Sequence, residues 1–311
     1  MIDFFDRLYS LPHKSKILEK IRYYGALHRI SRLSANIFVP IYFILTKYKK
    51  QYTLEFSTKS EGRIIVSLTT FPVRIGRIWL VIETILRQTQ KPDKIILWLS
   101  KEQFNSIDFL PKRLKMQIDR GLEIRLMDGN IRSHTKYYYT LHEFPNDYML
   151  TIDDDVFYRS TMVEDMVNYS HRYPKTIISQ YSKKMQWIED KLVSYSVWPI
   201  INEETSPNLF SFFLQVGGTL FPPFAMDPEV NNLNLIMSLT PLADDVWLNA
   251  MCRLKGTKIV KTNYFSNFLP VLYLYNETLN SINIGMKQND VQIHAVSEYF
   301  IKNRGINPFS K

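Results

Sequence analysis

The sequence predicts an α/β protein with a mostly parallel sheet flanked by helices. From Arg63 onward, apolar segments typical of strands alternate with segments whose apolar residues recur at helical spacing. The strand segments are almost continuous in apolar residues, as in a sheet that is covered on both faces. With 311 residues, 45% of them hydrophobic, the chain can build the core of one large domain or of two small ones.

The first part of this alternation runs to residue 152. The run IIVSLTTF at 64–71 is β-branched and stops at Pro72, and the segment after it has apolar residues at helical spacing up to Leu86. The sequence KPD then breaks the chain before a second strand. The expected strands are 64–71, 95–100, 123–127 and 148–152, and the expected helices are 78–86, a segment after Pro111, and 136–142.

The second part has weaker signals. Gly217 and Gly218 are expected to introduce a short aromatic strand that Pro222 and Pro223 end. The tail from Asn276 is expected to be a loop until Val291. The other expected elements are a helix at 162–169, strands at 176–180 and 192–197, and a helix at 246–254.

Residues 1–60 are predicted to form a basic, partly apolar helical segment in front of the main domain at 61–311. They hold eleven Lys and Arg against four Asp and Glu, which is +7 of the formal net charge of +9. The apolar run 37–45 is interrupted by Pro40 and is well short of the roughly 20 residues that span a bilayer. Two interpretations stay open: a helical pair that packs on the main domain, or peripheral attachment to an anionic membrane surface.

The remaining composition favours the cytoplasm, with the protein either free or peripheral on the inner face of the cytoplasmic membrane. Residues 1–10 are acidic and aromatic, which does not match a secretory signal. The single cysteine, Cys252, excludes an intramolecular disulfide and fits a reducing compartment. No nucleic-acid partner is expected, because the basic excess shares its segment with the apolar run.

The run YMLTIDDDVFY at 148–158 carries the main functional signal. It places three aspartates, 153 to 155, at the end of an apolar strand, where burying them unpaired would cost several kcal/mol per ion. Ligands of open α/β sheets bind beyond the carboxyl ends of the strands. A hard cation, Mn²⁺ or Mg²⁺, held by one or two carboxylates and by substrate phosphates would explain the charges. A solvated acidic turn before a helix near Thr161 is the structural alternative.

With this motif in place, the chain resembles the GT-A nucleotide-sugar glycosyltransferases, and specifically the bacterial enzymes, similar to family 2, that build capsular and lipopolysaccharide sugars. The resemblance rests on IIVSLTTFPVRI, QKPDKIILWLS, YMLTIDDDVFY, the GGTLFPP run at Gly217 and the ADDVWL run at Ala243. It implies a GT-A fold with a nucleotide-binding half at 61–160 and an acceptor half at 161–311. It also implies metal-dependent transfer of a sugar from a nucleotide-sugar to a saccharide or lipid-linked saccharide in surface polysaccharide synthesis.

The resemblance implies a role for several acidic residues. Asp155 would ligate the metal, with Asp153 near the metal or the ribose, and His294 is a candidate ligand or else a structural histidine. Inverting members of the family keep an acidic pair at the start of a helix to take the proton of the acceptor hydroxyl. This makes Asp245 the first candidate for the base and Asp244 the second, the alternative being a simple helix cap. Retention of configuration stays open.

Donor contacts are expected near the strand ends, where the alternatives are ordinary surface charges and turn glycines. Many family 2 enzymes hold the base with an aspartate just after the second strand, where LWLSKEQF offers only Glu102, so Asp128 is expected to substitute. UDP is the expected nucleotide, with GDP and others open. Trp187 and Trp198 would stack on sugars or pack in the core. The expected nucleotide-sugar-binding residues are Thr69, Arg74, Asp128, Lys136, Asp153, Asp154, Gly217 and Gly218.

Two other functions are compatible with the sequence. A phosphotransferase of the haloacid dehalogenase type also has Asp-x-Asp after an apolar strand, but that motif requires Thr or Val where this chain has Phe157. A non-catalytic module that binds sugar or nucleotide would keep the fold without needing both acidic runs. The presence of both runs favours an enzyme.

Overall fold

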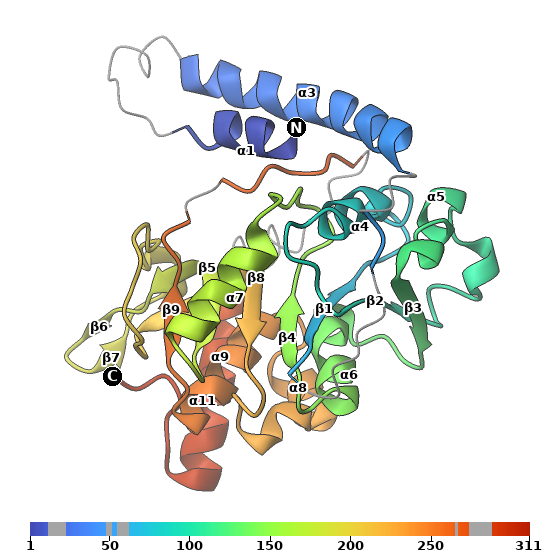
Figure 1. The fold of residues 1–311 in the computed structure, drawn as a ribbon. Helices are drawn as coiled ribbons and strands as arrows, with labels where there is room; N and C mark the ends of the chain where they lie inside the picture. Colours follow the sequence, from blue (N-terminus) through green and yellow to red (C-terminus); the bar gives the residue numbers. More distant parts are fainter. Residues whose placement is uncertain (12–22, 48–51, 55–61, 265–266, 274–287) are drawn as a thin grey trace.

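The computed structural model describes residues 1–11, 23–47, 52–54, 62–264, 267–273 and 288–311. A seven-stranded sheet with the order β3-β2-β1-β4-β8-β5-β9 forms its centre (Figure 1). Neighbouring strands are parallel except where β8 pairs with β4 and β5. The predicted α/β class with a mostly parallel sheet is confirmed. The strands are β1 (Ile64–Thr69), β2 (Lys94–Ser100), β3 (Leu122–Met127), β4 (Tyr148–Thr151), β5 (Ile177–Lys184), β8 (Ser211–Phe221) and β9 (Ile259–Lys261).

The strand order changes direction beside β1. From β1 the chain runs outward to β2 and β3, and it then places β4 on the other side of β1. Ser67 of β1 is opposite Ile96 of β2 and Thr151 of β4, and all three strands are parallel. Their carboxyl ends therefore lie at one edge of the sheet. Open α/β sheets bind their ligands at such a switch point.

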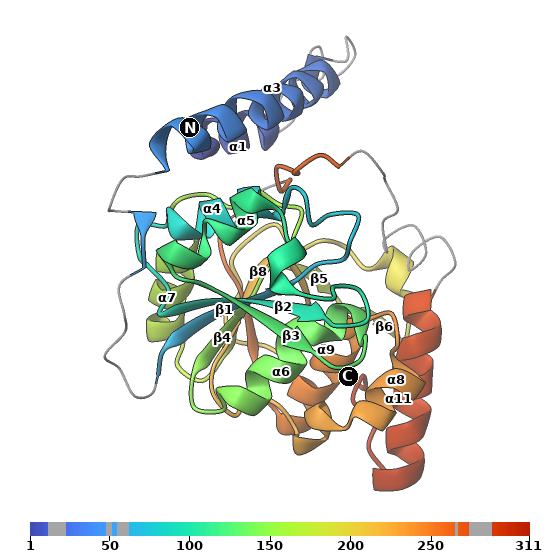
Figure 2. The ribbon, with the colours of Figure 1, turned by 90° about the vertical axis from the view of Figure 1, so that its right-hand side faces the viewer.

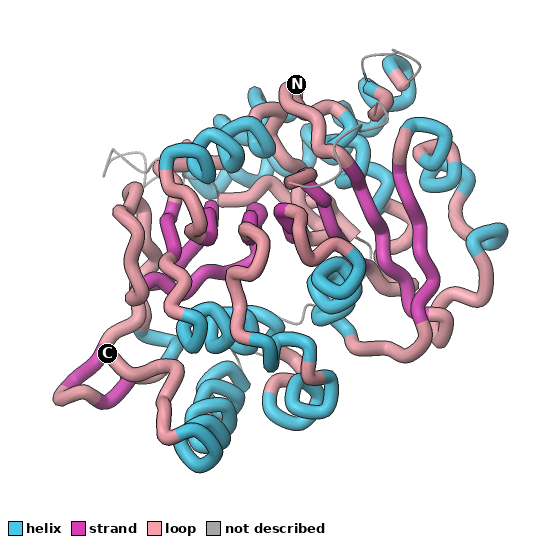
Figure 3. Tube along the Cα trace, turned by 60° about the horizontal axis from the view of Figure 1, so that its bottom comes forward, coloured by secondary structure: helices cyan, strands magenta, loops and turns pink. Residues whose placement is uncertain are grey.

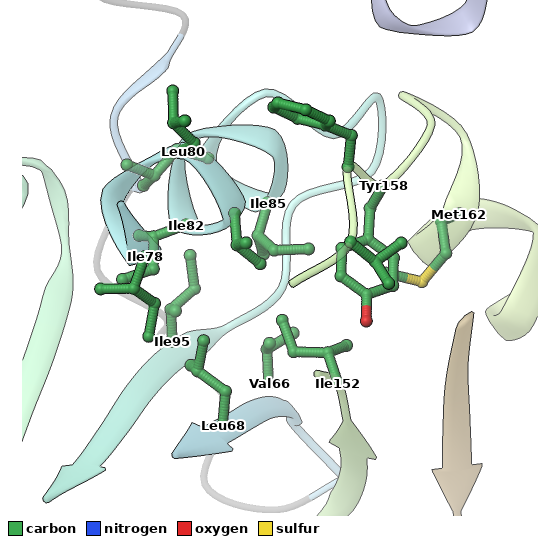
Figure 4. Packing of buried hydrophobic residues seen from close by; sticks show 14 of the residues in the cluster. Val66, Leu68, Ile78, Leu80, Ile82, Ile85, Ile95, Ile152, Tyr158 and Met162 are labelled. Atoms are coloured by element: carbon green, nitrogen blue, oxygen red, sulfur yellow. The ribbon is translucent and has the colours of Figure 1, made fainter. Parts of the chain in front are cut away.

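Helices cover both faces of the sheet, so that in Figure 3 the strands lie between two groups of helices. On one face, α4 (Ile78–Leu86) and α7 (Met162–Arg172) pack on apolar side chains of β1, β2 and β4 (Figure 4). On the other face, α6 (Thr135–Glu143), α9 (Asp244–Lys255) and α11 (Gln288–Arg304) form a second apolar core. Because both faces are covered, the central strands are apolar at nearly every position.

Most predicted elements are present within a few residues of the expected bounds. The strand predicted at 192–197 is wrong, because Tyr195–Val197 forms a 3-10 turn and only the short hairpin of β6 (Trp187–Ile188) and β7 (Lys191–Leu192) precedes it. The aromatic strand begins before the glycines and not after them, since β8 contains both. The short helices α5 (Lys112–Lys115) and α8 (Leu233–Leu239) complete the described elements. Of the loop predicted from Asn276 until Val291, residues 276–287 lie outside the described residues, and its end is wrong because α11 begins at Gln288.

The described part of the N-terminal segment contains two α-helices. Helices α1 (Ile2–Tyr9) and α3 (Tyr23–Thr46) lie together outside the layered domain (Figures 1 and 2). One face of α3 is buried against α1 and α4. None of the helices in the described part of the chain is both long enough and apolar enough to span a bilayer.

Candidate active site

The first cluster of charged side chains lies where β1 and β4 end. Arg74, in the turn after β1, forms ion pairs with Asp154 and with Asp155, the latter at 2.8 Å from Nη1 to Oδ2. The hydroxyl of Thr70 donates to Oδ2 of Asp154 at 2.5 Å. The residues after these two neighbouring strands therefore meet, as the parallel pairing of β1 and β4 requires.

A second cluster joins this strand end to the start of α9. The ammonium group of Lys136 lies 2.9 Å from Oδ1 of Asp153 and 3.3 Å from Oδ2 of Asp244. Lys136 is buried in the first turn of α6. One lysine thus connects the DDD run with the ADDVWL run, although the two aspartates are 91 positions apart in the sequence.

Gln215 of β8 holds the acidic pair in place. Its side-chain amide donates to Oδ2 of Asp244, and its backbone N–H donates to Oδ1 of Asp245 at 3.0 Å. Both aspartates lie in the first turn of α9, where the positive end of the helix dipole favours carboxylates. The pair is therefore fixed by the sheet and by the helix together.

His134 is buried near Asp244 and Lys136 and adds no charge to the second cluster. Its Nε2–H donates to the carbonyl of Thr240 at 2.7 Å, and its Nδ1 accepts from the hydroxyl of Tyr137 at 2.8 Å. Burial lowers the pKa of His134, so the imidazole is neutral and its tautomer is set by the carbonyl, which can only accept. Lys136 and Arg74 are then the cations that contact four of the five aspartates of the two clusters in the described ion pairs, and Asp245 is in none of these pairs.

Burial changes the pKa values of two aspartates of the DDD run. Burial, with the repulsion of Asp153 added to it, raises the pKa of Asp155 to about 6, even though Arg74 opposes the change. Burial also raises the pKa of Asp154. A raised carboxylate pKa means that additional positive charge at this position would be stabilising.

The two aspartates of α9 differ in their pKa values. Burial and the neighbouring charge of Asp244 raise the pKa of Asp245 well above its usual value. Burial acts on Asp244 in the same direction, but the charge of Lys136 more than offsets it, and the pKa of Asp244 is lowered. The same attraction keeps the pKa of Lys136 above its usual value despite burial. Asp244 is therefore an ion-pair partner, whereas Asp245 is the stronger base of the two when it is ionised.

The residues at the end of β4 fit a divalent metal that a substrate helps to hold. Among the described residues, no three His, Cys, Asp or Glu side chains converge to hold a metal by themselves. The side chains of Asp153 and Asp155 remain partly exposed, and the pKa of Asp155 stays raised although Arg74 pairs with it. One or two carboxylates with substrate phosphates as the remaining ligands is the usual arrangement for Mg²⁺, and oxygen ligands also suit Mn²⁺.

The segment 267–273 supports the aspartate turn from outside the sheet. The backbone N–H of Phe157 donates to the carbonyl of Leu269, and that of Val271 donates to the carbonyl of Asp155 at 2.8 Å. The hydroxyl of Tyr273 donates to the carbonyl of Asp154 at 2.7 Å, and its ring lies 5.3 Å from the guanidinium of Arg74. The backbone of the aspartate run is therefore fixed by a part of the chain more than 110 residues further on.

Helix α3 holds this same segment on its other side. The side chain of Asn36 donates to the carbonyl of Pro270 at 2.9 Å and accepts from the N–H of Leu272 at 2.8 Å. Asn36 also accepts from Arg77 at 3.2 Å. Hydrogen bonds thus connect the N-terminal helix with the aspartate turn through residues 270–272.

Three predicted residues lie apart from the two clusters. His294 is exposed on α11 and pairs with Glu298 at 3.1 Å. Asp128 is exposed at the end of β3 and pairs with Lys101 at 2.9 Å. The hydroxyl of Thr69 donates to the carbonyl of Trp98, so of the two threonines after β1 it is Thr70 that contacts the aspartates. None of the contacts described for these residues reaches Asp153, Asp154 or Asp155.

The predicted glycines and tryptophans have structural surroundings. Gly217 and Gly218 both have positive φ, of 83° and 109°, where β5 and β8 shift register. A Cβ on Gly217 would lie 2.1 Å from the ring of Phe268, so in this structure the close approach at Gly217 is made by that ring. Trp198 is buried and donates to the carbonyl of Val193, and Trp187 donates to the carbonyl of Phe309.

Comparisons with known proteins give fold-level similarity only. The sequence matches no protein-family model, and no curated protein matches it. Among solved structures, the mannosyltransferase PcManGT from Pyrobaculum calidifontis, in complex with GDP-Man and Mn²⁺, aligns at 12% identity and a TM-score of 0.47 over 90% of this chain and 77% of its own. TarS 1-349 from S. aureus aligns at 13% identity and a TM-score of 0.46 over 78% and 73%.

A third solved structure has a different activity in its name. It is the 4-diphosphocytidyl-2C-methyl-D-erythritol synthase from Anaerococcus prevotii, which aligns at 15% identity and a TM-score of 0.41 over 73% of this chain and 99% of its own. Identities and TM-scores this low give no evidence of function, so a function has to be inferred from the side chains of the site itself.

Proposed function

We propose that the chain is a metal-dependent nucleotide-sugar glycosyltransferase of the GT-A type. The observation that carries the proposal is the bridge of Lys136 between Asp153, at the end of β4, and Asp244, at the start of α9. It brings the two acidic runs into one site at the switch point of the sheet. A binding module has no need for two acidic runs in one site, whereas a transferase uses one run for the donor and the other for the acceptor.

The DDD run would hold the donor. Asp153 and Asp155 would bind Mn²⁺ or Mg²⁺, with the diphosphate of a nucleotide-sugar as the other ligand, and a UDP-sugar is the proposed donor. When bound, the metal supplies positive charge that offsets the charge growing on the leaving diphosphate. Arg74 and Lys136 add fixed positive charge beside the carboxylates, where it would act on the phosphates as well.

Asp245 would act as the general base in an inverting transfer. Its carboxylate would accept the proton of the acceptor hydroxyl while that oxygen forms its bond to C1 of the sugar, and the electron pair of the C1–O bond would leave with the diphosphate. The raised pKa of Asp245 brings its basicity closer to the working pH, which favours general base catalysis. Gln215 fixes the orientation of the carboxylate.

The proposed acceptor is a saccharide or a lipid-linked saccharide at the inner face of the cytoplasmic membrane, in the synthesis of a capsule or of lipopolysaccharide. The sequence resemblance supports this part of the proposal. The exposed sides of Asp153 and Asp155 leave the donor position open to solvent, as a large acceptor requires.

The test is donor hydrolysis and thermal stabilisation with UDP-, GDP-, CMP- and dTDP-sugars, each with Mn²⁺ and with EDTA. We expect one nucleotide to stabilise the protein, and its sugar to be released, only when metal is present. Asp245→Asn should keep the metal-dependent stabilisation and lose roughly 10² to 10⁴-fold in turnover. Hydrolysis of a phosphate ester in place of any nucleotide-sugar, or an Asp245→Asn variant with wild-type turnover, would contradict the proposal.

A further inference from the structure

Helix α3 has a second apolar face that no described part of the chain covers. Its buried side chains recur every four residues, Ser31, Ala35, Val39 and Phe43, and pack toward α1 and α4. With 3.6 residues per turn, the side chains at 30, 33, 37, 41 and 44 lie on the opposite side. They are exposed, together with those at 38 and 45. The outer face of α3 therefore comprises Ile30, Leu33, Ile37, Phe38, Ile41, Ile44 and Leu45.

This outer face is large and strongly exposed for a surface made of isoleucine, leucine and phenylalanine. Ile30 is 62% exposed, Ile37 57% and Leu45 77%. The helix lies on the outside of the molecule, away from the sheet (Figure 2). Contiguous apolar surface of this kind marks a site of contact with a protein or a membrane.

The charge around α3 favours a membrane over a second copy of the chain as the partner. The helix itself contains no Asp or Glu. Residues 12–50 hold nine Lys and Arg and one Glu, a net charge of +8, with basic residues on both sides of the apolar run. A second copy of the chain docked on this face would bring two such segments together, whereas an anionic bilayer has the opposite charge.

We propose that the outer face of α3 binds an anionic membrane surface, with the helix axis in the plane of the interface. Apolar side chains would enter the boundary between headgroups and acyl chains, and the flanking lysines and arginines would contact the headgroups. The described helices cannot span a bilayer, so the contact is peripheral. This surface is separate from the aspartate site, and membrane binding does not depend on the reaction at that site.

The hydrogen bonds of Asn36 connect the outer face of α3 with the aspartate turn. Asn36 lies on α3 between the buried and the outer face and holds residues 270–272, which in turn hold the backbone of Asp155. Binding of α3 to a bilayer would therefore set the orientation of the aspartate turn relative to that bilayer. A lipid-linked acceptor would meet the site from a fixed direction.

The test is flotation of the full chain with vesicles of phosphatidylcholine and phosphatidylglycerol, compared with vesicles of phosphatidylcholine alone. The variant Ile37→Ser with Ile41→Ser removes two side chains of the outer face, which are 57% and 50% exposed. The matched control is Ile301→Ser with Ile306→Ser, two isoleucines of similar exposure, 50% and 53%, near the C-terminus. All three proteins should unfold at the same temperature, because none of these side chains is buried.

We expect the wild type and the control to float with the anionic vesicles, and added salt to weaken this binding. The Ile37→Ser, Ile41→Ser variant should bind at least about tenfold more weakly, since two apolar side chains no longer leave water. Equal binding by this variant, or absence of wild-type binding, would overturn the proposal. The proposal would also be overturned if the wild type formed a dimer in solution and the two substitutions dissociated that dimer. Donor hydrolysis without vesicles should be the same in all three, which separates this result from a failure of the proposed reaction.

Discussion

Lys136 is a single residue on which both acidic clusters depend. Its buried ammonium contacts Asp153 and Asp244, so Lys136→Met should leave two carboxylates without their cation. Removing one partner of a buried ion pair costs about 3–5 kcal/mol in unfolding free energy, and we expect a loss of this size in urea denaturation.

The matched control is Lys101→Met. Lys101 also pairs with an aspartate at 2.9 Å, but both side chains are largely exposed, and such surface pairs contribute about 0–1 kcal/mol. If the loss at Lys136 arises from uncompensated charge, adding Asp244→Asn to Lys136→Met should recover part of it. Equal stability of the Lys136→Met and Lys101→Met variants would contradict this account of the site.

Within strand β8, two adjacent glycines are needed for different reasons. Both have positive φ, which costs a residue with a side chain about 1–3 kcal/mol. Only at Gly217 would a Cβ also meet the ring of Phe268, at 2.1 Å, whereas at Gly218 the nearest atom is 3.5 Å away. We therefore expect Gly217→Ala to lower the unfolding free energy by about 2–5 kcal/mol, and Gly218→Ala by less.

A double-variant comparison separates backbone strain from collision. Adding Phe268→Ala should recover stability in the Gly217→Ala background but not in the Gly218→Ala background. Recovery of equal size in both would show that collision with the ring is not the cause.

Helix α3 and the aspartate turn are connected through one side chain. Asn36→Ala removes the hydrogen bonds to Pro270 and Leu272, which are partly buried, and a backbone group left unsatisfied there costs at most about 1–3 kcal/mol. We expect metal-dependent donor affinity to fall by about tenfold, although Asn36 contacts no carboxylate in the described contacts. Asn303→Ala, which removes an exposed asparagine hydrogen bond on α11, should leave donor affinity unchanged. Unchanged affinity in Asn36→Ala would refute the coupling.

At the scale of elements, the sequence predicts best where burial is complete. Strands β1, β2 and β4 are recognisable because both of their faces are covered, and α4, whose residues are all buried, is recognisable from its apolar content. The segment 192–197 contains the residues of a strand, but Ser194 caps a 3-10 turn through its side chain there. That hydrogen bond depends on local geometry, which apolar patterning does not report.

At the scale of the whole molecule, the sequence predicts which residues carry charge at the sheet edge but not how they pair. Arg74 and Lys136 are identifiable as cations near the ends of predicted strands, while their ion pairs with the aspartates follow from the order of the strands. Gln215 belongs to no recognisable motif. It is a single residue of β8 whose side-chain amide reaches Asp244 only in the folded chain. Tyr273 lies on a segment without helical or strand periodicity, so only the folded chain shows that it holds the aspartate turn.

The pH dependence of stability should contain a contribution from Lys261. Its ammonium is buried and donates to the carbonyls of Thr262 and Tyr264, and burial lowers its pKa to about 8. Between that pH and the unfolded value near 10.4, the unfolded chain binds the proton and the folded chain does not. Stability from this group therefore rises with pH across that window, by up to about 3 kcal/mol. In Lys261→Met, the free energy of unfolding from urea denaturation should not show this rise between pH 8 and 10. The same pH dependence in the variant and the wild type would contradict the assignment to Lys261.

The measurement that tests the central claim most directly is metal-dependent donor binding by Asp155→Asn, with Asp190→Asn as the control. Both substitutions remove one negative charge, but the side chain of Asp190 is 85% exposed and its described ion pair is with Lys311. If the DDD run holds the metal, the wild type and Asp190→Asn should bind a nucleotide-sugar with Mn²⁺ and lose it in EDTA. Asp155→Asn should bind roughly 100-fold more weakly with Mn²⁺. Wild-type affinity in Asp155→Asn, or equal wild-type binding in EDTA, would contradict the account.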